Sequence, residues 1–432
     1  MGSVMATPMG TVDLFDQEYA LDPFPVWDGL RENAPVHYEP DTGLWLVSRY
    51  DDVRTVLRDT RTFLPDNAMD AIGRFSMPTL RVLARARFAL PPTLASNGGE
   101  SHAGYRRVMT RLLNAQAVTA AVPMIEQVTG ECLDQLERRL DADGVCDLAT
   151  TLARDVPLRV LLRMLGLEGA EDVGLDTLAR WGDASLELFW GRPDAARQIE
   201  LAGEAADFYS WLRGLVTGPG AASGALLAAL AEHRLPDGRP LRAAESAAVL
   251  YFIVIAGQAT TRQMLSIMYR RALGEPGLWR RFADEPDGVE PWTDEVLRRE
   301  PPITTWRRVT GRPVTLSGVD IPAGAPLLLM LASTGSDPDV FDSPEQLCPH
   351  RPNRRKHLAF GVGRHRCSGA ELARTEADVV LRTTAARLPD LRLVDPSSVP
   401  EMLGLLSFRA PLHVLVERAA SHPGAGRDAA AR

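Results

Sequence analysis

The most regular pattern along the chain is helical. From Ser101 to about Leu215, leucine, alanine and valine recur at spacings of three and four residues, with arginine and glutamate between them, which predicts a series of amphipathic helices. A further helix is predicted over about Arg242 to Leu273, and because its middle is apolar on every side we expect it to pass through the interior. Shorter helices are predicted over about Asp51 to Arg58, Trp292 to Glu300 and Ser368 to Leu388.

The remaining segments are predicted to form a few short strands and two irregular stretches. Val36 to Val47 is typical of a β-hairpin, and short strands are predicted between Val314 and Met330. Pro65 to Gly99 mixes proline, glycine and apolar residues without steady periodicity, which predicts a long loop of the kind that covers a binding site. Asp337 to Arg355 is rich in proline and aspartate and is predicted to be irregular.

These elements favour one large, mainly α fold with a small β-rich region. The 432 residues show no internal repeat and no clear linker. We therefore expect a single domain over residues 21–418, preceded by a loosely ordered N-terminus (1–20) and followed by a disordered tail (419–432).

Charge and cysteine content narrow the class of protein. A net charge of −8 argues against a nucleic-acid binder, which needs a basic excess. The longest apolar run, Ala247 to Gly257, is shorter than the ~20 residues that span a bilayer, and no signal peptide precedes it. Four cysteines in so long a chain fit a reducing compartment. We expect a cytoplasmic protein that binds neither nucleic acid nor membrane.

The strongest chemical signal is a cysteine, Cys367, in a glycine-rich turn directly before a helix. The helix N-terminus and the amides of the turn lower the pKa of a thiol and stabilise a thiolate. A dinucleotide loop is excluded because Arg366 stands where its third glycine belongs, and the chain has no C-x-x-C pair for zinc. An anionic, hydrogen-bonded sulfur shielded from water is what a thiolate ligand of haem iron requires.

The segment from Phe360 to Gly369 resembles the haem-thiolate loop of cytochrome P450 enzymes, and every fixed position of the pattern F-G-x-G-x-H-x-C-x-G is filled. The resemblance implies the mainly α cytochrome P450 fold, haem b (iron-protoporphyrin IX) as cofactor and Cys367 as axial ligand of the iron. Phe360, Gly361 and Gly369 are then cofactor-binding positions. Glu295 and Arg298 match the family's E-x-x-R pair, which Arg351 completes in a structural role.

Further motifs of the family follow in their proper order. The resemblance assigns the two haem propionates to a set of cations: His102, Arg106, Arg308, His357 and His365. Ala256 to Thr261 matches the stretch that crosses the distal haem face, where Thr260 takes the position of the catalytic threonine. Ala259 stands where the family usually has an acidic residue of the proton route, which leaves waters, Gln258, Thr260 or the substrate to supply protons. Ser368 replaces the usual leucine and places a hydroxyl near the sulfur.

The same correspondence predicts the substrate pocket. Its expected lining comes from the buried helix, from the segment after Pro302 and from a C-terminal hairpin: Phe252, Ile255, Ala256, Ala259, Ile303, Thr304, Thr305, Trp306, and Leu405 to Phe408 with Leu406 among them. A pocket that is apolar, with a few hydroxyls and aromatic rings, suits a small aromatic or heterocyclic substrate.

The predicted activity is that of a haem monooxygenase that uses O2 to oxidise a secondary metabolite, most simply by hydroxylation. No electron-transfer domain is fused to the chain, so we expect a separate ferredoxin and ferredoxin reductase. The ferredoxin is expected to dock beside basic residues near the cysteine: Arg351, Arg354, Arg355, Lys356, Arg364 and Arg366. Ala259 prompts an alternative, oxidative coupling of aromatic substrates such as cyclic dipeptides. A catalytically silent partner protein is a third hypothesis, which the presence of Cys367 and Thr260 disfavours.

Overall fold

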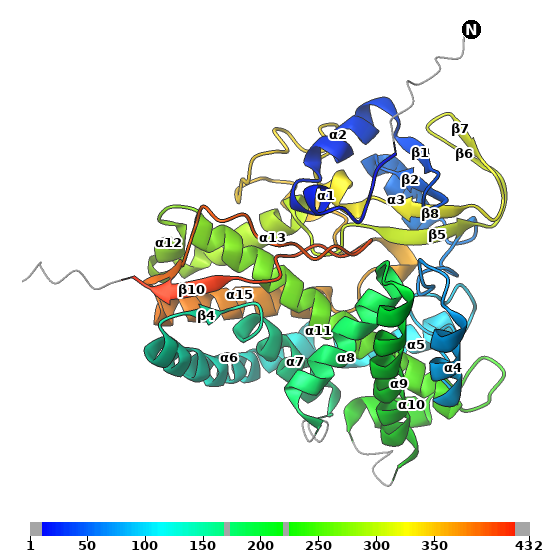
Figure 1. Cartoon of the computed structure of the whole chain (residues 1–432), viewed down its shortest axis with the longest axis horizontal. Coiled ribbons are helices and arrows are strands. Elements are labelled where there is room, and N and C mark those ends of the chain that lie inside the picture. The colour runs from blue at the N-terminus through cyan, green and yellow to red at the C-terminus, as the bar shows by residue number, and fades with distance from the viewer. Residues whose placement is uncertain (1–10, 168–172, 219–223, 420–432) are drawn as a thin grey trace, which may run out of the picture.

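The computed structural model describes residues 11–167, 173–218 and 224–419, and helices dominate it (Figure 1). The helices are α1 (Gln17–Leu21), α2 (Phe24–Asn33), α3 (Tyr50–Arg58), α4 (Met77–Arg85), α5 (His102–Leu112), α6 (Ala115–Asp143), α7 (Leu152–Leu165), α8 (Leu175–Trp190), α9 (Ala195–Thr217), α10 (Ala225–Glu232), α11 (Ala243–Gly274), α12 (Leu278–Asp284), α13 (Val289–Arg299), α14 (Leu331–Thr334) and α15 (Ala370–Arg387). The predicted fold class, mainly α with a small β region, is confirmed.

The strands form three small sheets at the edges of the helical body. Five of them pair in the order β1-β2-β8-β5-β3, with β2 and β8 parallel. Their bounds are β1 (Val36–Glu39), β2 (Leu44–Val47), β3 (Phe63–Leu64), β5 (Trp306–Thr310) and β8 (Pro326–Leu329); the smaller sheets contain β4 (Cys146–Asp147), β6 (Val314–Leu316), β7 (Val319–Ile321), β9 (Leu391–Leu393) and β10 (Leu415–Arg418). The hairpin predicted over Val36 to Val47 is confirmed as β1 and β2.

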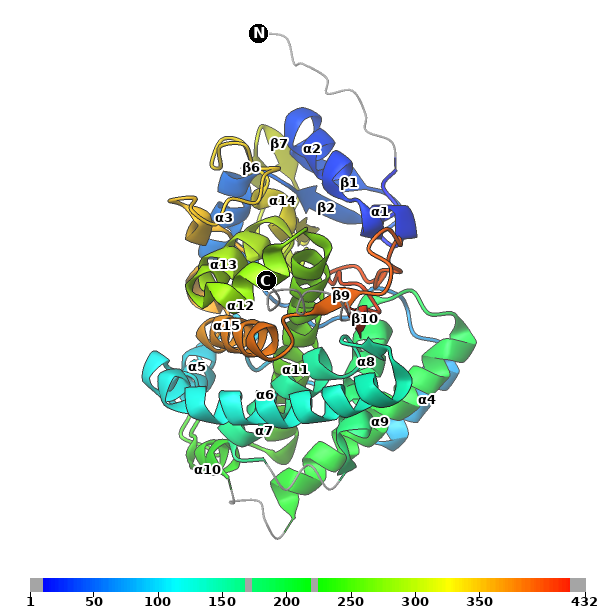
Figure 2. The same ribbon diagram turned by 90° about the vertical axis from the view of Figure 1, so that its left-hand side faces the viewer.

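The long helix α11 passes through the middle of the molecule, as its all-round apolar pattern predicted (Figure 2). It packs against α7, α8, α9 and α15, and most of its side chains are buried. By length and composition α11 could also cross a membrane, but 61% of its most apolar window is buried inside the fold, as in the core helix of a globular protein.

Two predictions of irregular structure are wrong. Within the predicted loop of residues 65–99, Met77 to Arg85 form α4, because the Ser76 hydroxyl caps its N-terminus by accepting from the Thr79 amide at 3.3 Å and the helix packs on α9. In the N-terminus, Leu14 is buried in the core and α1 begins at Gln17. Residues 1–10 and 420–432 lie outside the described part of the chain.

Candidate active site

A single cavity brings together segments that are far apart in the sequence. Its walls come from α11, α5, α15, strand β5 and the loop that carries Cys367. Of the predicted site residues, fifteen line it: His102, Arg106, Phe252, Ile255, Ala256, Thr260, Ile303, Trp306, Arg308, Phe360, Gly361, His365, Cys367, Gly369 and Phe408. The remaining predicted residues lie elsewhere, as described below.

The cysteine loop is held open by backbone geometry. Gly361 and Gly363 adopt left-handed φ angles of 62° and 79°, which side chains disfavour. A Cβ at Gly363 would also lie 3.2 Å from the Leu57 carbonyl oxygen. The Cys367 amide donates to the Phe360 carbonyl at 2.8 Å, and the Arg374 guanidinium lies 4.7 Å from the centre of the Phe360 ring. The turn therefore presents Cys367 at the cavity wall immediately before α15.

The sulfur of Cys367 receives support from both backbone and charge. Burial raises the pKa of its thiol, while the Gly369 N–H, Arg106, Arg366 and Arg374 oppose that rise. The sequence predicted a lowered pKa; in the protein chain alone burial outweighs the helix N-terminus. The hydrogen-bond donor and cations that a thiolate needs are nevertheless in place.

The Ser368 hydroxyl does not serve the sulfur as expected. Its oxygen accepts from the Arg106 guanidinium at 2.5 Å, and the same nitrogen of Arg106 donates to the Arg366 carbonyl at 2.6 Å. Ser368 therefore positions a cation at the cavity wall.

Two guanidinium groups and two imidazole rings face the cavity, and none of the four is paired with a carboxylate in the described structure. Arg308 is 1% exposed, its Nε has no partner, and burial lowers its pKa to about 10. The His102 and His365 rings lie 4.3 Å apart, and burial followed by neighbouring arginines lowers their pKa values to about 4 and about 3. Arg106 completes the set.

These orphaned groups fit the two propionates of haem. Buried guanidinium and imidazole groups that lack partners carry a desolvation cost, which an anionic ligand offsets through charge-assisted hydrogen bonds. His365 Nε2 is buried without a partner, as Arg308 Nε is. A flat, dianionic group with an iron centre near Cys367 matches this donor set.

His357 is a correction to the predicted clamp. It does not line the cavity; its Nδ1 accepts from the Ala359 amide at 3.2 Å, and its ring faces a separate surface cleft on the other side of the cysteine loop. The sequence motif placed it correctly beside the loop, but the direction of its side chain depends on the fold.

On α11 the structure separates the predicted residues into two groups. Ala256, Gly257, Thr260 and Thr261 follow one another at helical spacing and line the cavity, and the Thr260 hydroxyl donates to the Ala256 carbonyl at 2.5 Å. Gln258 and Ala259 are fully buried and absent from the cavity lining. The Gln258 amide instead faces Gly182 of α8, where a Cβ would come within 3.0 Å of it.

The substrate side of the cavity is more aromatic than predicted. Trp190, which was not predicted, joins the predicted Phe252, Trp306 and Phe408. The Trp190 and Phe408 rings meet edge-to-face at 5.4 Å. Thr304, Thr305 and Leu406 are corrections: all three are buried in the fold and do not line the cavity. The Thr305 hydroxyl donates to the Leu406 carbonyl at 3.0 Å, which fastens the segment after Pro302 to the C-terminal turn.

Several lining residues escaped the sequence reading. Ile253 and Met264 could have been found from the three-and-four spacing around Thr260 on a helix. Met69 and Leu94 come from the loop over residues 65–99, which the sequence predicted to cover a binding site. No sequence signal points to Leu161, Leu186, Trp190 or Glu376, because they come from distant helices.

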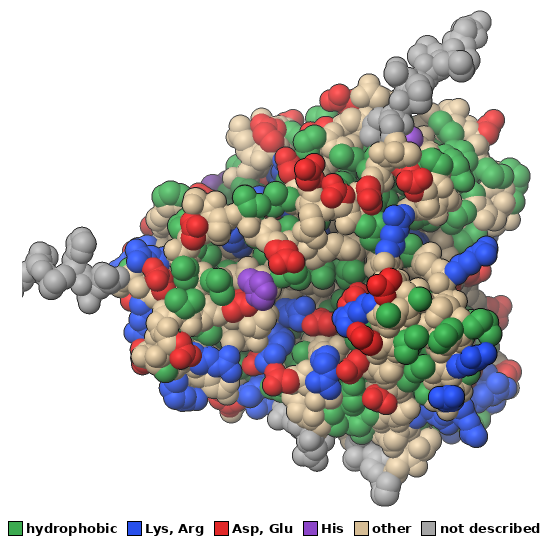
Figure 3. Space-filling model, in the orientation of Figure 1, with side chains coloured by type: hydrophobic (Ala, Val, Ile, Leu, Met, Phe, Trp, Pro, Cys, Tyr) green, Lys and Arg blue, Asp and Glu red, His purple; other side chains and the backbone are tan. Residues whose placement is uncertain are grey.

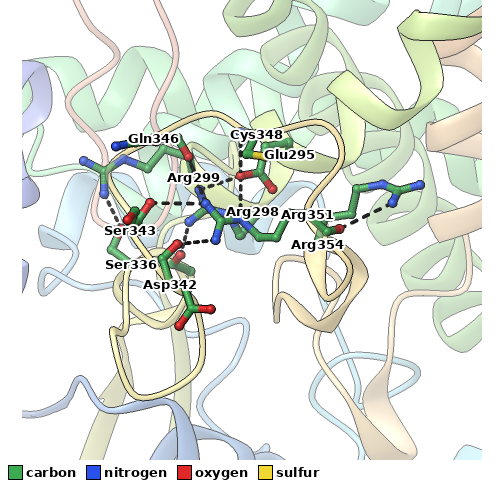
Figure 4. A network of polar contacts seen from close by, with 11 residues as sticks. Glu295, Arg298, Arg299, Ser336, Asp342, Ser343, Gln346, Cys348, Arg351 and Arg354 are labelled. Carbon is green, nitrogen blue, oxygen red and sulfur yellow. Dashed lines mark hydrogen bonds and ion pairs between the residues drawn. The ribbon is translucent and has the colours of Figure 1, made fainter.

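The E-x-x-R pair lies outside the cavity in a buried polar network (Figure 4). Glu295 Oε1 accepts from Arg298 at 2.8 Å, from Arg351 at 2.9 Å and from the Cys348 amide at 3.1 Å. Arg298 and Arg351 also donate to backbone carbonyls, including that of Gln346. The network fastens α13 to the irregular segment that precedes the cysteine loop.

Basic residues concentrate in the cleft behind the cysteine loop. Six cations line it, namely Arg54, Arg58, Arg355, Lys356, Arg366 and Arg374, together with two acids, Asp51 and Asp339. Of the predicted docking residues, Arg351 instead belongs to the buried network and Arg364 contacts His102 at 3.2 Å. On the face of the molecule shown in Figure 3 basic and acidic side chains are interspersed.

Comparison with known proteins agrees with this site. The cytochrome P450 family model matches residues 291–388. Cytochrome P450 monooxygenase PikC of Streptomyces venezuelae is 28% identical, in an alignment that covers 91% of this chain and 90% of PikC. Erythromycin C-12 hydroxylase of Saccharopolyspora erythraea is 29% identical, in an alignment that covers 88% of this chain and 90% of the hydroxylase. The structure of cytochrome P450 CREJ in complex with (4-ethylphenyl) dihydrogen phosphate superposes with a TM-score of 0.86 at 27% identity, covering 94% of this chain and 99% of that one.

The match to the cytochrome P450 family model over residues 291–388, the actinobacterial P450 relatives and the shared fold together support a bacterial cytochrome P450. It is a haem-thiolate oxidoreductase of the monooxygenase type, which uses O2, an organic substrate and electrons from a redox partner. Its similarity extends to bacterial P450 enzymes of secondary metabolism.

Proposed function

We propose that the chain holds haem b with Cys367 as the axial ligand, and that it oxidises a small secondary metabolite, most simply by hydroxylation. The observation that supports this best is the combination of Cys367 with two arginines and two histidines that have no carboxylate partner, all in one cavity. Arg308, His365, His102 and Arg106 would hold the propionates through charge-assisted hydrogen bonds. The bound haem supplies oxygen activation, to which the thiolate contributes electron density.

The residues of the chain then have distinct roles around the reaction. Phe360 lies beside Cys367 in the cavity wall, and the Gly369 N–H donates to the sulfur. Thr260 presents a hydroxyl at the cavity face of α11, where it can donate to an oxygen ligand or a water. Ala256 leaves space beside it because its side chain is short. Gly257 instead lets α7 approach closely, since a Cβ there would lie 2.8 Å from the Leu161 side chain.

We propose an aromatic or heterocyclic substrate of compact shape. Trp190, Phe252, Trp306 and Phe408 supply ring surfaces for stacking, and the cavity around them is apolar. Relatives named as PikC and as an erythromycin hydroxylase support a role in secondary metabolism. A cytoplasmic location fits the bacterial relatives and the reducing compartment that the cysteines favour.

The electrons would come from a ferredoxin, reduced by its own reductase, that docks on the basic cleft. The cleft shares Phe360, Gly361 and Arg366 with the cavity wall, so a partner seated there is separated from the haem site by the cysteine loop alone. Its excess of cations on an acidic chain complements an acidic protein. One similar solved structure is an intact type IV self-sufficient cytochrome P450 monooxygenase, which is 30% identical. The alignment covers 94% of this chain but only 52% of that longer protein.

Oxidative coupling of aromatic substrates is the second candidate. Position 259 is an alanine packed in the core, so the usual acidic residue of the proton route is absent there. A cavity with four aromatic side chains favours substrates that form stabilised ring radicals, such as aromatic cyclic dipeptides. Product analysis distinguishes the two, because coupling joins two substrate molecules without adding oxygen.

Two experiments test the proposal. The reduced carbon monoxide complex of the purified protein should show the thiolate signature, and Cys367→Ala should lose it while Cys348→Ala keeps it. Titration of the ferric protein with aromatic amino acid derivatives, cyclic dipeptides, macrolides and terpenoids should give a low-to-high-spin shift with one class. A protein that binds no haem would support the silent-partner hypothesis instead.

A further inference from the structure

One face of α4 is exposed and has no role in the site described so far. Its side chains follow one another at helical spacings of three and four residues: Met77, Leu80, Arg81, Ala84 and Arg85. Met77 and Leu80 are 62% and 43% exposed, and Ile199 of α9, the helix that packs on α4, is also exposed. We call this surface the α4 face. Exposed apolar side chains that lie close together favour binding of another molecule.

The α4 face also carries a local excess of positive charge on an acidic chain. Four arginines lie on it or directly beside it: Arg74, Arg81, Arg85 and Arg87. All four are exposed, none pairs with a described residue, and no acidic residue lies between Asp70 and Glu100. On α9, Glu200 and Glu204 pair with other arginines, which leaves Asp207 as the one acid of that helix without a partner. The arginines are therefore free to attract a negatively charged molecule.

The α4 face covers the substrate side of the cavity. Met69 and Leu94, which lie before and after α4, both line the cavity. The Phe75 and Phe88 rings, at the two ends of the helix, pack on the Phe189 ring with centres 5.9 and 6.1 Å away. The basic cleft behind the cysteine loop contains no residue of α4 or of its flanks. The α4 face is thus a second basic surface, separate from the proposed ferredoxin site.

The cavity and the α4 face suit two different parts of one ligand. Of the arginines in the cavity wall, Arg106 and Arg308 are assigned to haem and Arg366 belongs to the cysteine loop, so the aromatic substrate side has no cation for an acidic substrate. The arginines of the α4 face lie outside the cavity and attract negative charge that stays there. A compact aromatic group joined to an acidic protein meets both conditions.

We propose that the α4 face docks a small acidic carrier protein, which presents the substrate to the cavity on a flexible arm. The substrate class is then an aromatic acyl or aminoacyl thioester of that carrier. The nine residues of α4 span about 14 Å, so the contact is small and fits a transient complex that forms quickly and weakens as salt rises. The inference rests on the proposed oxidation of an aromatic substrate in this cavity.

The first test measures docking. The probe is the acyl carrier protein of a bacterial fatty-acid synthase, labelled with a fluorophore on its phosphopantetheine thiol. In anisotropy titrations it should bind the haem-loaded protein, and binding should weaken as salt rises. Arg81→Glu combined with Arg85→Glu should lower the affinity about tenfold or more. Arg81→Gln with Arg85→Gln replaces this double variant if it does not fold.

The matched control makes the same charge change on a distant helix. Arg138→Glu combined with Arg139→Glu alters two exposed arginines of α6 that pair with no described residue, and it should bind the carrier within about twofold of the wild type. Equal losses in the two double variants would overturn the proposal, because net charge alone would then explain them. A wild type that does not bind the carrier would overturn it as well.

The second test separates this surface from other partners. Lys356→Glu in the basic cleft should leave carrier binding unchanged, and the α4 double variant should be reduced by ferredoxin at the wild-type rate. Phosphatidylglycerol vesicles should not bind; vesicle binding that the α4 double variant abolishes would show that the face meets a membrane, and would overturn the proposal. A wild type without the thiolate signature would refute the proposed haem site, whereas the anisotropy titrations decide the docking surface independently of it.

Discussion

Replacing Glu295 by glutamine should destabilise the protein more than any exposed charge substitution. Glu295 and Arg298 are fully buried, Arg351 is nearly so, and one oxygen of Glu295 accepts three hydrogen bonds. Glutamine preserves the shape but removes the negative charge between two buried guanidinium groups. Breaking a buried ion pair in this way costs about 3–5 kcal/mol, a large share of the ~5–15 kcal/mol that stabilises a typical domain.

The measurement is the free energy of unfolding from urea titration of haem-free protein, followed by circular dichroism. The control is Glu187→Gln, which removes an exposed ion pair with Arg197 at 2.7 Å and should cost less than ~1 kcal/mol. A free energy of unfolding for Glu295→Gln within ~1 kcal/mol of the wild-type value would show that the network does not hold α13 to the segment before the cysteine loop.

Further predictions concern backbone fit, ionisation, oxygen chemistry and docking. Gly335→Ala should prevent normal folding, because the new Cβ would lie 1.8 Å from the Arg298 carbonyl oxygen. The control is Gly203→Ala, where nothing lies within 4 Å of the new Cβ, and its melting temperature should equal or exceed that of the wild type. The haem-free protein should lose stability as pH falls from 6.5 towards about 4, because His102 and His365 stay neutral in the folded protein while the unfolded chain binds protons at both residues. The free energy of unfolding from urea titrations measures this, and a constant value over that pH range would show that burial does not lower the two pKa values. Thr260→Ala should raise the hydrogen peroxide released per O2 consumed, with Thr260→Ser close to wild type, if its hydroxyl guides protons. Lys356→Glu should slow reduction by ferredoxin, most at low salt, without changing the spectrum of the carbon monoxide complex.

Local patterns in the sequence predicted the helices and the cysteine loop well. The three-and-four spacing of apolar residues, the all-round apolar core helix and the Phe360 to Gly369 motif each depend on neighbours along the chain, and the fold places them as expected. The prediction of irregular structure over residues 65–99 was wrong at α4, because a serine cap and packing on α9 stabilise a short helix there.

Side-chain direction was decided by the tertiary structure. Sequence placed His357 and His365 beside the same loop, but only His365 faces the cavity, because the loop turns between them. Thr304, Thr305 and Leu406 lie next to lining residues yet point into the fold, and Trp190 and Glu376 reach the cavity from helices that no motif marks. The sequence by itself determined which chemistry the chain carries, because a motif is a local arrangement of backbone and side chains. Which groups share one cavity depended on how distant helices pack, since that packing buries Arg308 and Glu376 and leaves Arg308 Nε and His365 Nε2 without partners.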